Sequence, residues 1–244
     1  MSTPNPDDQV ANGSPGALDG RAVLVTGGSS GLGAAVARRV ADAGATPVVL
    51  DRRRAEAPWQ TIEVDLADAE ATFEAVEEAL RIDRPLAGVV TCAGIDHPAP
   101  FTELPFDRWE EVLRVNLLGT AAVARASLAR LEADRGRLVT VASTLGHRTA
   151  GDASAYCASK WGVVGFSRAL TEELKGRVSV TMLTPGGMNT AFFDGRTAQY
   201  KPGPDAGLCD PADVADTVVF ALSRPPGCDI KELVVAGPTE SSWP

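Results

Sequence analysis

A glycine-rich segment between an apolar run and a helix-forming run constrains the fold more than any other part of this sequence. The run Ala22–Thr26 is short, apolar and β-branched, as expected of a buried parallel strand. Glycines follow at positions 27, 28, 31 and 33, and residues 34–43 then favour a helix that ends at Gly44. Glycines let the backbone approach a pyrophosphate, and a helix start offers free N–H groups. The sequence therefore predicts a dinucleotide-binding α/β fold.

An acidic residue ends the next predicted strand. Residues 47–50 are apolar, and Asp51 follows them about twenty residues after the glycine loop. A carboxylate at this place accepts hydrogen bonds from the adenosine ribose and repels a 2′-phosphate. Ser30 favours NAD as well, because a basic residue there would favour NADP. Arg52, Arg53 and Arg54 come next and leave NADP open, since one of them could pair with a 2′-phosphate.

Tyr156 and Lys160 are separated by four positions, and Ser143 lies thirteen positions upstream of Tyr156. Side chains four residues apart on a helix are neighbours, with Cβ atoms roughly 6 Å apart. We expect Lys160 to lower the pKa of Tyr156 from its usual value of about 10, because a nearby cation favours the phenolate. Such a tyrosine can exchange a proton with an alcohol or a carbonyl. A tyrosine and a lysine with this spacing also occur by chance on helix surfaces. The glycine loop elsewhere in the sequence favours a catalytic role for this pair.

Strands and helices alternate along the rest of the chain, which predicts a parallel sheet with right-handed crossovers. The predicted strands are residues 22–26, 47–50, 61–64, 87–91, 137–142, 178–183 and 232–235. The predicted helices are residues 34–43, 67–80, 106–131, 153–174 and 212–222. Ligands of such sheets bind beyond the carboxyl ends of the strands, where Asp51, Gly94, Ser143 and Pro185 are all expected.

These motifs together resemble the short-chain dehydrogenase/reductase (SDR) family over about residues 20–237. The residues that carry the resemblance are Thr26, Gly27 through Gly33, Ser143, Tyr156 and Lys160. The resemblance implies an α/β, Rossmann-like, doubly wound parallel sheet of about seven strands in the order 3-2-1-4-5-6-7, with helices on both faces. It also implies an NAD(P)-dependent oxidoreductase that moves a hydride between nicotinamide and a secondary alcohol or ketone of a small metabolite.

The resemblance gives the catalytic residues as Asn116, Ser143, Tyr156 and Lys160. Tyr156 would be the general acid/base, Lys160 would also hold the nicotinamide ribose, and Ser143 would stabilise the substrate oxygen. Asn116 would anchor a water for proton relay, or would simply be a helix-interior residue bonded to backbone. The implied cofactor-binding residues are Gly27, Ser29, Ser30, Gly31, Leu32, Gly33, Asp51, Arg52, Asp65, Leu66, Cys92, Ala93, Gly94, Tyr156, Lys160, Pro185, Gly186 and Thr190.

The sequence departs from the family pattern in two places. Cys92 stands where the family usually has an asparagine before Ala93 and Gly94, so hydrogen bonds of that asparagine would be missing or replaced by water. Only residues 52–60 link Asp51 to the third predicted strand. This link is too short for the helix that the family often places there, so the adenine side of the site is expected to be more open.

The substrate walls should come from residues 95–101, 144–152 and 187–208, the last forming a lid. Predicted substrate contacts are Ile95, His97, Thr144, His147, Met188 and Phe192. Asp96, Asp152 and Asp194 near the same mouth leave open a cationic substrate, such as an amino sugar. The alternatives are an NADPH-dependent 3-oxoacyl or polyketide ketoreductase and a non-catalytic nucleotide-binding sensor.

Composition narrows the class of protein and its partners. A formal net charge of −9 argues against nucleic acid as a partner. We see neither an apolar run of membrane-spanning length nor a signal-peptide pattern, so a cytoplasmic protein is expected. The four cysteines lack metal-ligand spacing, and no metal is predicted.

Residues 1–17 are expected to be a disordered arm, and residues 18–244 a single domain. The long helices carry apolar residues on more than one face, and the resemblance to the family implies that they pair across subunits in a homodimer or homotetramer.

Overall fold

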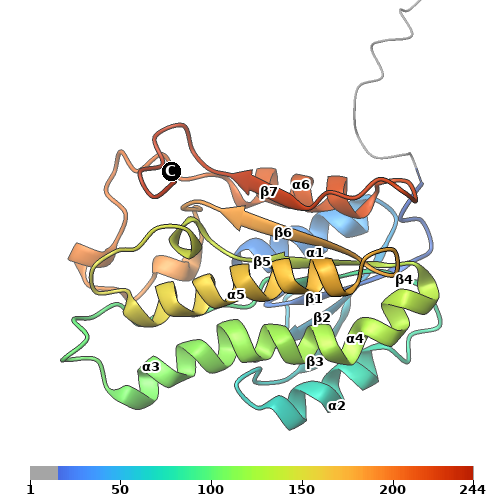
Figure 1. The fold of residues 1–244 in the computed structure, drawn as a ribbon, viewed down its shortest axis with the longest axis horizontal. Coiled ribbons are helices and arrows are strands. Elements are labelled where there is room, and N and C mark those ends of the chain that lie inside the picture. The colour runs from blue at the N-terminus through green and yellow to red at the C-terminus, as the bar shows by residue number, and fades with distance from the viewer. Residues whose placement is uncertain (1–15, 244) are drawn as a thin grey trace, which may run out of the picture.

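The computed structural model describes residues 16–243, and its centre is a seven-stranded parallel sheet (Figure 1). The strands are β1 Ala22–Thr26, β2 Thr46–Asp51, β3 Gln60–Glu63, β4 Leu86–Thr91, β5 Arg137–Val141, β6 Ser179–Pro185 and β7 Glu232–Val235. Their order is β3-β2-β1-β4-β5-β6-β7, and every neighbouring pair is parallel. The predicted topology is confirmed. The order reverses between β1 and β4, which is where such sheets bind ligands.

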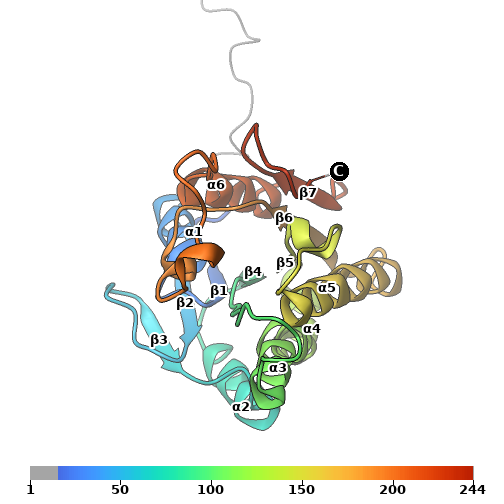
Figure 2. The ribbon, with the colours of Figure 1, turned by 90° about the vertical axis from the view of Figure 1, so that its left-hand side faces the viewer.

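Helices cover both faces of the sheet. They are α1 Gly31–Asp42, α2 Ala69–Ala79, α3 Phe106–Leu113, α4 Thr120–Asp134, α5 Ser154–Glu173 and α6 Pro211–Leu222. Buried residues of α1 and α6 form one core with one face of the strands, and those of α2, α4 and α5 form the core on the other face. Figure 2 looks onto the carboxyl ends of the strands and shows this three-layer arrangement.

The predicted helix 106–131 is interrupted. A π-helical turn, Arg114–Gly119, joins α3 to α4 in one continuous helical run from Phe106 to Asp134. By length and composition this run could cross a membrane, contrary to the expectation from sequence, but 50% of its most apolar stretch is buried inside the fold. The link between β2 and β3 contains no helix, as predicted for these described residues.

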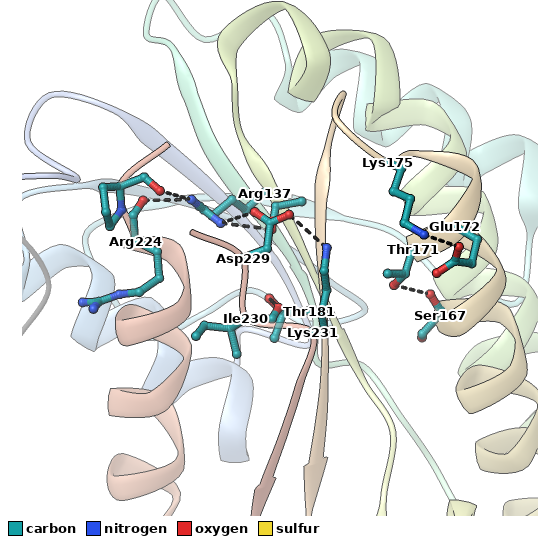
Figure 3. Close-up of polar contacts among 12 residues, drawn as sticks. Arg137, Ser167, Thr171, Glu172, Lys175, Thr181, Arg224, Asp229, Ile230 and Lys231 are labelled. Carbon is teal, nitrogen blue, oxygen red and sulfur yellow. Dashed lines mark hydrogen bonds and ion pairs between the residues drawn. The ribbon is translucent and has the colours of Figure 1, made fainter. Parts of the chain in front are cut away.

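A buried arginine fastens the end of the sheet that lies away from the carboxyl ends of the strands (Figure 3). Arg137, at the start of β5, is only 8% exposed. Its Nη2 donates to the carbonyl oxygens of Arg224 (2.8 Å) and Pro225 (3.2 Å), just beyond α6. Its Nη1 donates to Ser179 Oγ at 3.0 Å and lies 3.4 Å from Asp229 Oδ1. The guanidinium thus ties β5, β6 and the α6–β7 connection together and places a cation at a helix C-terminus.

Candidate active site

A cavity of about 1010 Å³ lies beyond the carboxyl ends of the strands. This volume is at the upper end of the range for small-molecule sites. All the predicted cofactor-binding residues line it except Ser29, as do five of the six predicted substrate contacts. Those five contacts are Ile95, His97, Thr144, Met188 and Phe192. Segments far apart in the sequence therefore meet in one cavity, as the positions of the strand ends predicted.

The glycine loop between β1 and α1 has a shape that larger residues cannot copy. Gly27 has φ +68°, in the left-handed region, and a Cβ atom on Gly33 would lie 2.2 Å from the carbonyl oxygen of Gly27. Helix α1 begins after Ser30, whose side chain does not cap it, and its first turn carries no acidic residue. The N–H groups at this helix start are therefore left for an anion.

Asp51 lines the cavity at the end of β2, and backbone N–H groups orient its carboxylate. Oδ2 accepts from Ser29 N at 3.0 Å, and Oδ1 accepts from Arg53 N at 3.1 Å. The Ser29 hydroxyl donates to the Arg53 carbonyl oxygen at 2.5 Å. Ser29 was predicted to bind the cofactor, but its groups are used to hold the Asp51 loop and it does not line the cavity. The guanidinium of Arg52 leans toward Glu111 on α3, at 3.9 Å.

Ser143, Tyr156 and Lys160 line the same part of the cavity. Ser143 follows β5, and its Oγ accepts from Leu145 N at 3.2 Å. Tyr156 is in the first turn of α5 and Lys160 in the next. Lys160 Nζ donates to the carbonyl oxygen of Val141 at 2.9 Å and lies 5.7 Å from the centre of the Tyr156 ring. The helix thus brings the phenol and the ammonium to one wall.

Burial controls the titration of this pair. It raises the pKa of Tyr156 to about 12, although the Ser143 hydroxyl acts in the opposite direction. It lowers the pKa of Lys160 to about 8. The prediction that Lys160 brings the tyrosine pKa below its usual value is therefore wrong for this structure, because desolvation outweighs the groups that lower this pKa, which are Ser143 and Arg196 and do not include Lys160.

Asn116 lies in the π-helical turn, is fully buried and does not line the cavity. Its Oδ1 accepts from Ile95 N at 2.8 Å, and its Nδ2 donates to Ile95 O at 2.9 Å and to Ser159 Oγ at 3.0 Å. The side chain therefore clamps the loop after β4 to α5, which matches the backbone-bonded alternative. Its place in a proton relay stays a prediction. Beside Cys92, the Ala93 N–H donates to Thr26 Oγ1 at 3.1 Å, which ties this loop to β1.

The two histidines of the chain lie in different surroundings. His97 lines the cavity, with Nε2 3.2 Å from Glu111 Oε2. His147 does not line it, and its contact with substrate stays a prediction. The His147 Nε2 atom is 3.4 Å from Thr184 Oγ1, and its ring meets Trp243 edge-on at 5.2 Å.

Sequence reasoning missed two sets of contacts in the cavity wall. The first is the C-terminal tail, where Glu240 Oε2 accepts from Gly187 N at 2.8 Å. Ser242 Oγ donates to Thr144 Oγ1 at 2.7 Å, which joins the tail to the residue after Ser143. The second is Arg196, which lies in the predicted lid and pairs with Asp96. No local pattern indicates either contact, because both depend on how distant segments fold back over the strand ends.

The family model for short chain dehydrogenases matches residues 21–201, and the protein belongs to this family. An uncharacterized oxidoreductase of Staphylococcus aureus (strain N315) is 30% identical and aligns over 89% of this chain and 97% of its own. The 2,5-dichloro-2,5-cyclohexadiene-1,4-diol dehydrogenase LinX of Sphingobium indicum is 33% identical, over 84% and 90% of the two chains.

Solved structures agree with this assignment. A putative NAD(P)-dependent gluconate 5-dehydrogenase from Beutenbergia cavernae, with bound NADP, is 34% identical. It superimposes with a TM-score of 0.78 over 91% of this chain and 97% of its own. An alcohol dehydrogenase of Thermococcus sibiricus has the same TM-score at 24% identity and supports the fold alone. The family and these relatives support NAD(P)-dependent oxidoreduction.

Proposed function

We propose that this protein transfers a hydride between a nicotinamide dinucleotide and a secondary alcohol or ketone, with Tyr156 as general acid/base. The observation that carries the proposal is the meeting of Ser143, Tyr156 and Lys160 with the glycine loop in one cavity. The cavity volume of about 1010 Å³ supports a site for a dinucleotide together with a small substrate. The family match supports the reaction type.

The residues present fit a dinucleotide. The glycine cradle and the uncapped start of α1 suit its pyrophosphate. Asp51 would accept hydrogen bonds from the adenosine ribose, with Asp65 and Leu66 beside the adenine, and Lys160 would hold the other ribose. When bound, the nicotinamide ring supplies or accepts the hydride. We propose NAD as the preferred cofactor, because the Asp51 carboxylate is held by backbone N–H groups where a 2′-phosphate would otherwise lie.

Tyr156 and Ser143 would act on the proton that the substrate oxygen gains or loses. A phenol with a pKa of about 12 is protonated at neutral pH, so Tyr156 is ready to donate to a carbonyl oxygen in the reducing direction. In the oxidising direction the same oxygen must first lose its proton and then accept one from the alcohol. The Ser143 hydroxyl can hydrogen-bond the substrate oxygen as charge develops on it. Acid/base catalysis of this kind contributes roughly 10²–10⁴-fold.

We also propose that the protein is a homodimer or homotetramer. Leu118, just before α4, and Trp161, on α5, expose 57% and 49% of their surface. Burial of such side chains against a second copy would be favourable, at about 25 cal/mol per Å² of apolar surface. Sedimentation velocity of the purified protein tests this, and a monomer at micromolar concentration would contradict it.

Turnover of a substrate panel tests the proposed activity. The wild-type protein is incubated with secondary alcohols and NAD or NADP, and with ketones and NADH or NADPH, while absorbance of the reduced nicotinamide is followed. A 3-oxobutanoyl thioester is included to represent 3-oxoacyl substrates. We expect turnover with alcohols or ketones and a higher kcat/KM with NAD(H). Tight nucleotide binding without turnover of any substrate would instead support a nucleotide sensor.

A further inference from the structure

A buried ion pair closes the substrate side of the cavity. Arg196 of the lid segment (residues 187–208) lies with Nη2 3.2 Å from Oδ2 of Asp96, in the loop after β4. The two side chains are only 12% and 6% exposed, and both residues line the cavity. Because the two charges of the pair cancel, Asp96 adds no net negative charge to this mouth. Asp152, the second acid of the mouth, accepts from Tyr200 OH at 2.9 Å.

The pair is incompletely hydrogen-bonded. Asp96 Oδ1 has no hydrogen-bond partner among the described residues, and Arg196 Nη2 is close to Asp96 without the alignment of a hydrogen bond. Both atoms are shielded from solvent. A buried polar atom without a partner is unfavourable, because it has lost its hydrogen bonds to water and gained none in the protein. One free acceptor and one free donor thus lie side by side in the wall, where a ligand hydroxyl group could satisfy both.

Aromatic rings hold this pair beside the predicted catalytic tyrosine. The Arg196 guanidinium lies 4.6 Å from the centre of the Phe192 ring and 4.9 Å from that of Phe193. Phe192 in turn lies 5.7 Å from the ring of Tyr156. Asp96 and Arg196 also act on the pKa of Tyr156 in opposite directions, so both charges are near the phenol. If the reacting carbon of a substrate lies at Tyr156, a group on the adjacent substrate carbon would therefore reach the Asp96–Arg196 pair.

The charge balance of the pair disfavours ionised substrates. A substrate carboxylate that took Arg196 would leave Asp96 as an unpaired buried charge, and a substrate ammonium that took Asp96 would leave Arg196 unpaired. Breaking a buried pair in this way is strongly unfavourable. A hydroxyl group avoids both costs, because it donates to a carboxylate and accepts from a guanidinium at the same time.

We propose that the Asp96–Arg196 pair selects a neutral substrate with a hydroxyl group beside the reacting carbon, as in a vicinal diol or an α-hydroxy ketone. This inference rests on the proposed hydride transfer and names its substrate class. Asp96 accepts the proton of the neighbouring hydroxyl group in a hydrogen bond, and Arg196 donates to its oxygen. Since Arg196 belongs to the lid and Asp96 to the loop after β4, a small separation of these two segments admits the hydroxyl group.

A three-carbon substrate series tests the proposal, because its members share a secondary alcohol at C2 and differ at C1. The series is propan-2-ol, propane-1,2-diol, lactate and 1-aminopropan-2-ol, with NAD or NADP. We expect the wild type to favour the diol over propan-2-ol by about 100-fold or more in kcat/KM, since a site built for a hydroxyl group rejects the analogue that lacks it. Lactate and the amino alcohol should be poorer than the diol.

Charge variants make the test specific to this pair. Asp96→Asn leaves the Arg196 charge unpaired and should raise the ratio of kcat/KM for lactate over that for the diol by about tenfold or more. Arg196→Met leaves the Asp96 charge unpaired and should raise the same ratio for the amino alcohol by a similar factor. The double variant Asp96→Asn/Arg196→Met leaves no buried charge and should lose the diol preference without gaining either ionised substrate. Asp107→Asn and Arg38→Met, on exposed positions outside the cavity wall and the lid, should keep the wild-type ratios. Circular dichroism checks that each variant is folded.

Two results would overturn the proposal: a wild type that oxidises propan-2-ol, lactate or the amino alcohol as well as the diol, or a double variant that keeps the wild-type preference. Either result leaves hydride transfer itself standing. If the wild type turns over none of the four alcohols and no ketone in the wider panel, the proposed function fails and this substrate class fails with it.

Discussion

Lys160 donates to the carbonyl oxygen of Val141 at 2.9 Å, while its ammonium lies 5.7 Å from the centre of the Tyr156 ring. The lysine is thus anchored to the end of β5 and fully buried. Only Cys92 acts on its pKa through charge, so little offsets the effect of burial. Its position is costly for the fold, because burial favours the neutral amine. A residue kept in a costly position is a candidate for a functional role rather than a structural one.

Replacement of Lys160 by methionine should therefore stabilise the protein at neutral pH. The folded pKa of about 8 is below the unfolded value of 10.5, so the unfolded chain binds more protons between these pH values. Burial of the Lys160 ammonium lowers the free energy of unfolding by about 3 kcal/mol below pH 8. This destabilisation disappears as the pH rises to 10.5. After loss of the hydrogen bond to Val141, we expect a net gain of about 1–2 kcal/mol at pH 7.

Urea unfolding of wild type and Lys160→Met at pH 7 and pH 10 measures this difference. The gain should shrink at the higher pH, and turnover should be lost at both. Lys201→Met, which removes an exposed lid lysine, should show no pH-dependent gain. A Lys160→Met protein that is less stable than wild type at pH 7 would show that the ammonium contributes to folding.

Tyr156→Phe should lower kcat by about 100-fold or more, because the ring remains and only the proton-transferring hydroxyl is lost. Nucleotide affinity, measured by fluorescence titration, should stay close to that of the wild type. The sequence has one other tyrosine, Tyr200, whose hydroxyl donates to Asp152 on the surface. Tyr200→Phe is therefore the matched control and should retain activity. A Tyr156→Phe enzyme with most of its turnover would remove the proposed role.

Asp51→Asn should shift cofactor preference toward NADP. The amide keeps a hydrogen-bond acceptor for one of the two backbone N–H groups from Ser29 and Arg53, but it no longer repels a 2′-phosphate. We expect the ratio of kcat/KM for NADH over that for NADPH to fall by about tenfold or more. Glu63→Gln, on the exposed side of β3, should leave the ratio unchanged. An unchanged ratio in Asp51→Asn would mean that other groups discriminate the cofactors.

Arg137→Met should destabilise the protein by about 2–4 kcal/mol, because four partners at the far end of the sheet lose their buried donor. The comparison is Arg168→Met, which removes an exposed pair with Glu232 and should cost less than about 1 kcal/mol. Thermal unfolding measures both changes. Turnover per folded molecule should survive in Arg137→Met, and similar losses of stability in both variants would contradict this account of Arg137.

The alternation of strands and helices was enough to predict a parallel sheet and the residues at its carboxyl ends, and the family resemblance supplied the order of the strands. Short apolar runs, a glycine loop and helical spacing are local signals, and parallel topology then brings Asp51, Ser143 and Tyr156 to one side. The direction of a side chain was harder to predict. Lys160 faces Val141 and His147 faces Thr184 because neighbouring strands offer hydrogen-bond partners there, and those partners are distant in the sequence.

Contacts of the lid and the tail were beyond sequence reasoning for the same reason. Arg196 is one of several charged residues in a loop without periodicity, and nothing near it indicates Asp96 as its partner. The π-helical turn that holds Asn116 was also missed, because its residues fit an ordinary helix equally well. In each case the deciding interaction is a long-range one that forms only when the sheet is complete.

The hydrogen bond between Ser242 and Thr144 has a practical consequence for anyone who produces this protein. Together with Glu240 it makes the last residues of the described chain a wall of the reaction chamber, close to the carboxyl label in Figure 1. Polypeptide fused after residue 244 would begin close to Ser242, which lines the cavity. Kinetic assays of a C-terminally tagged preparation would then report on the tag as much as on the enzyme.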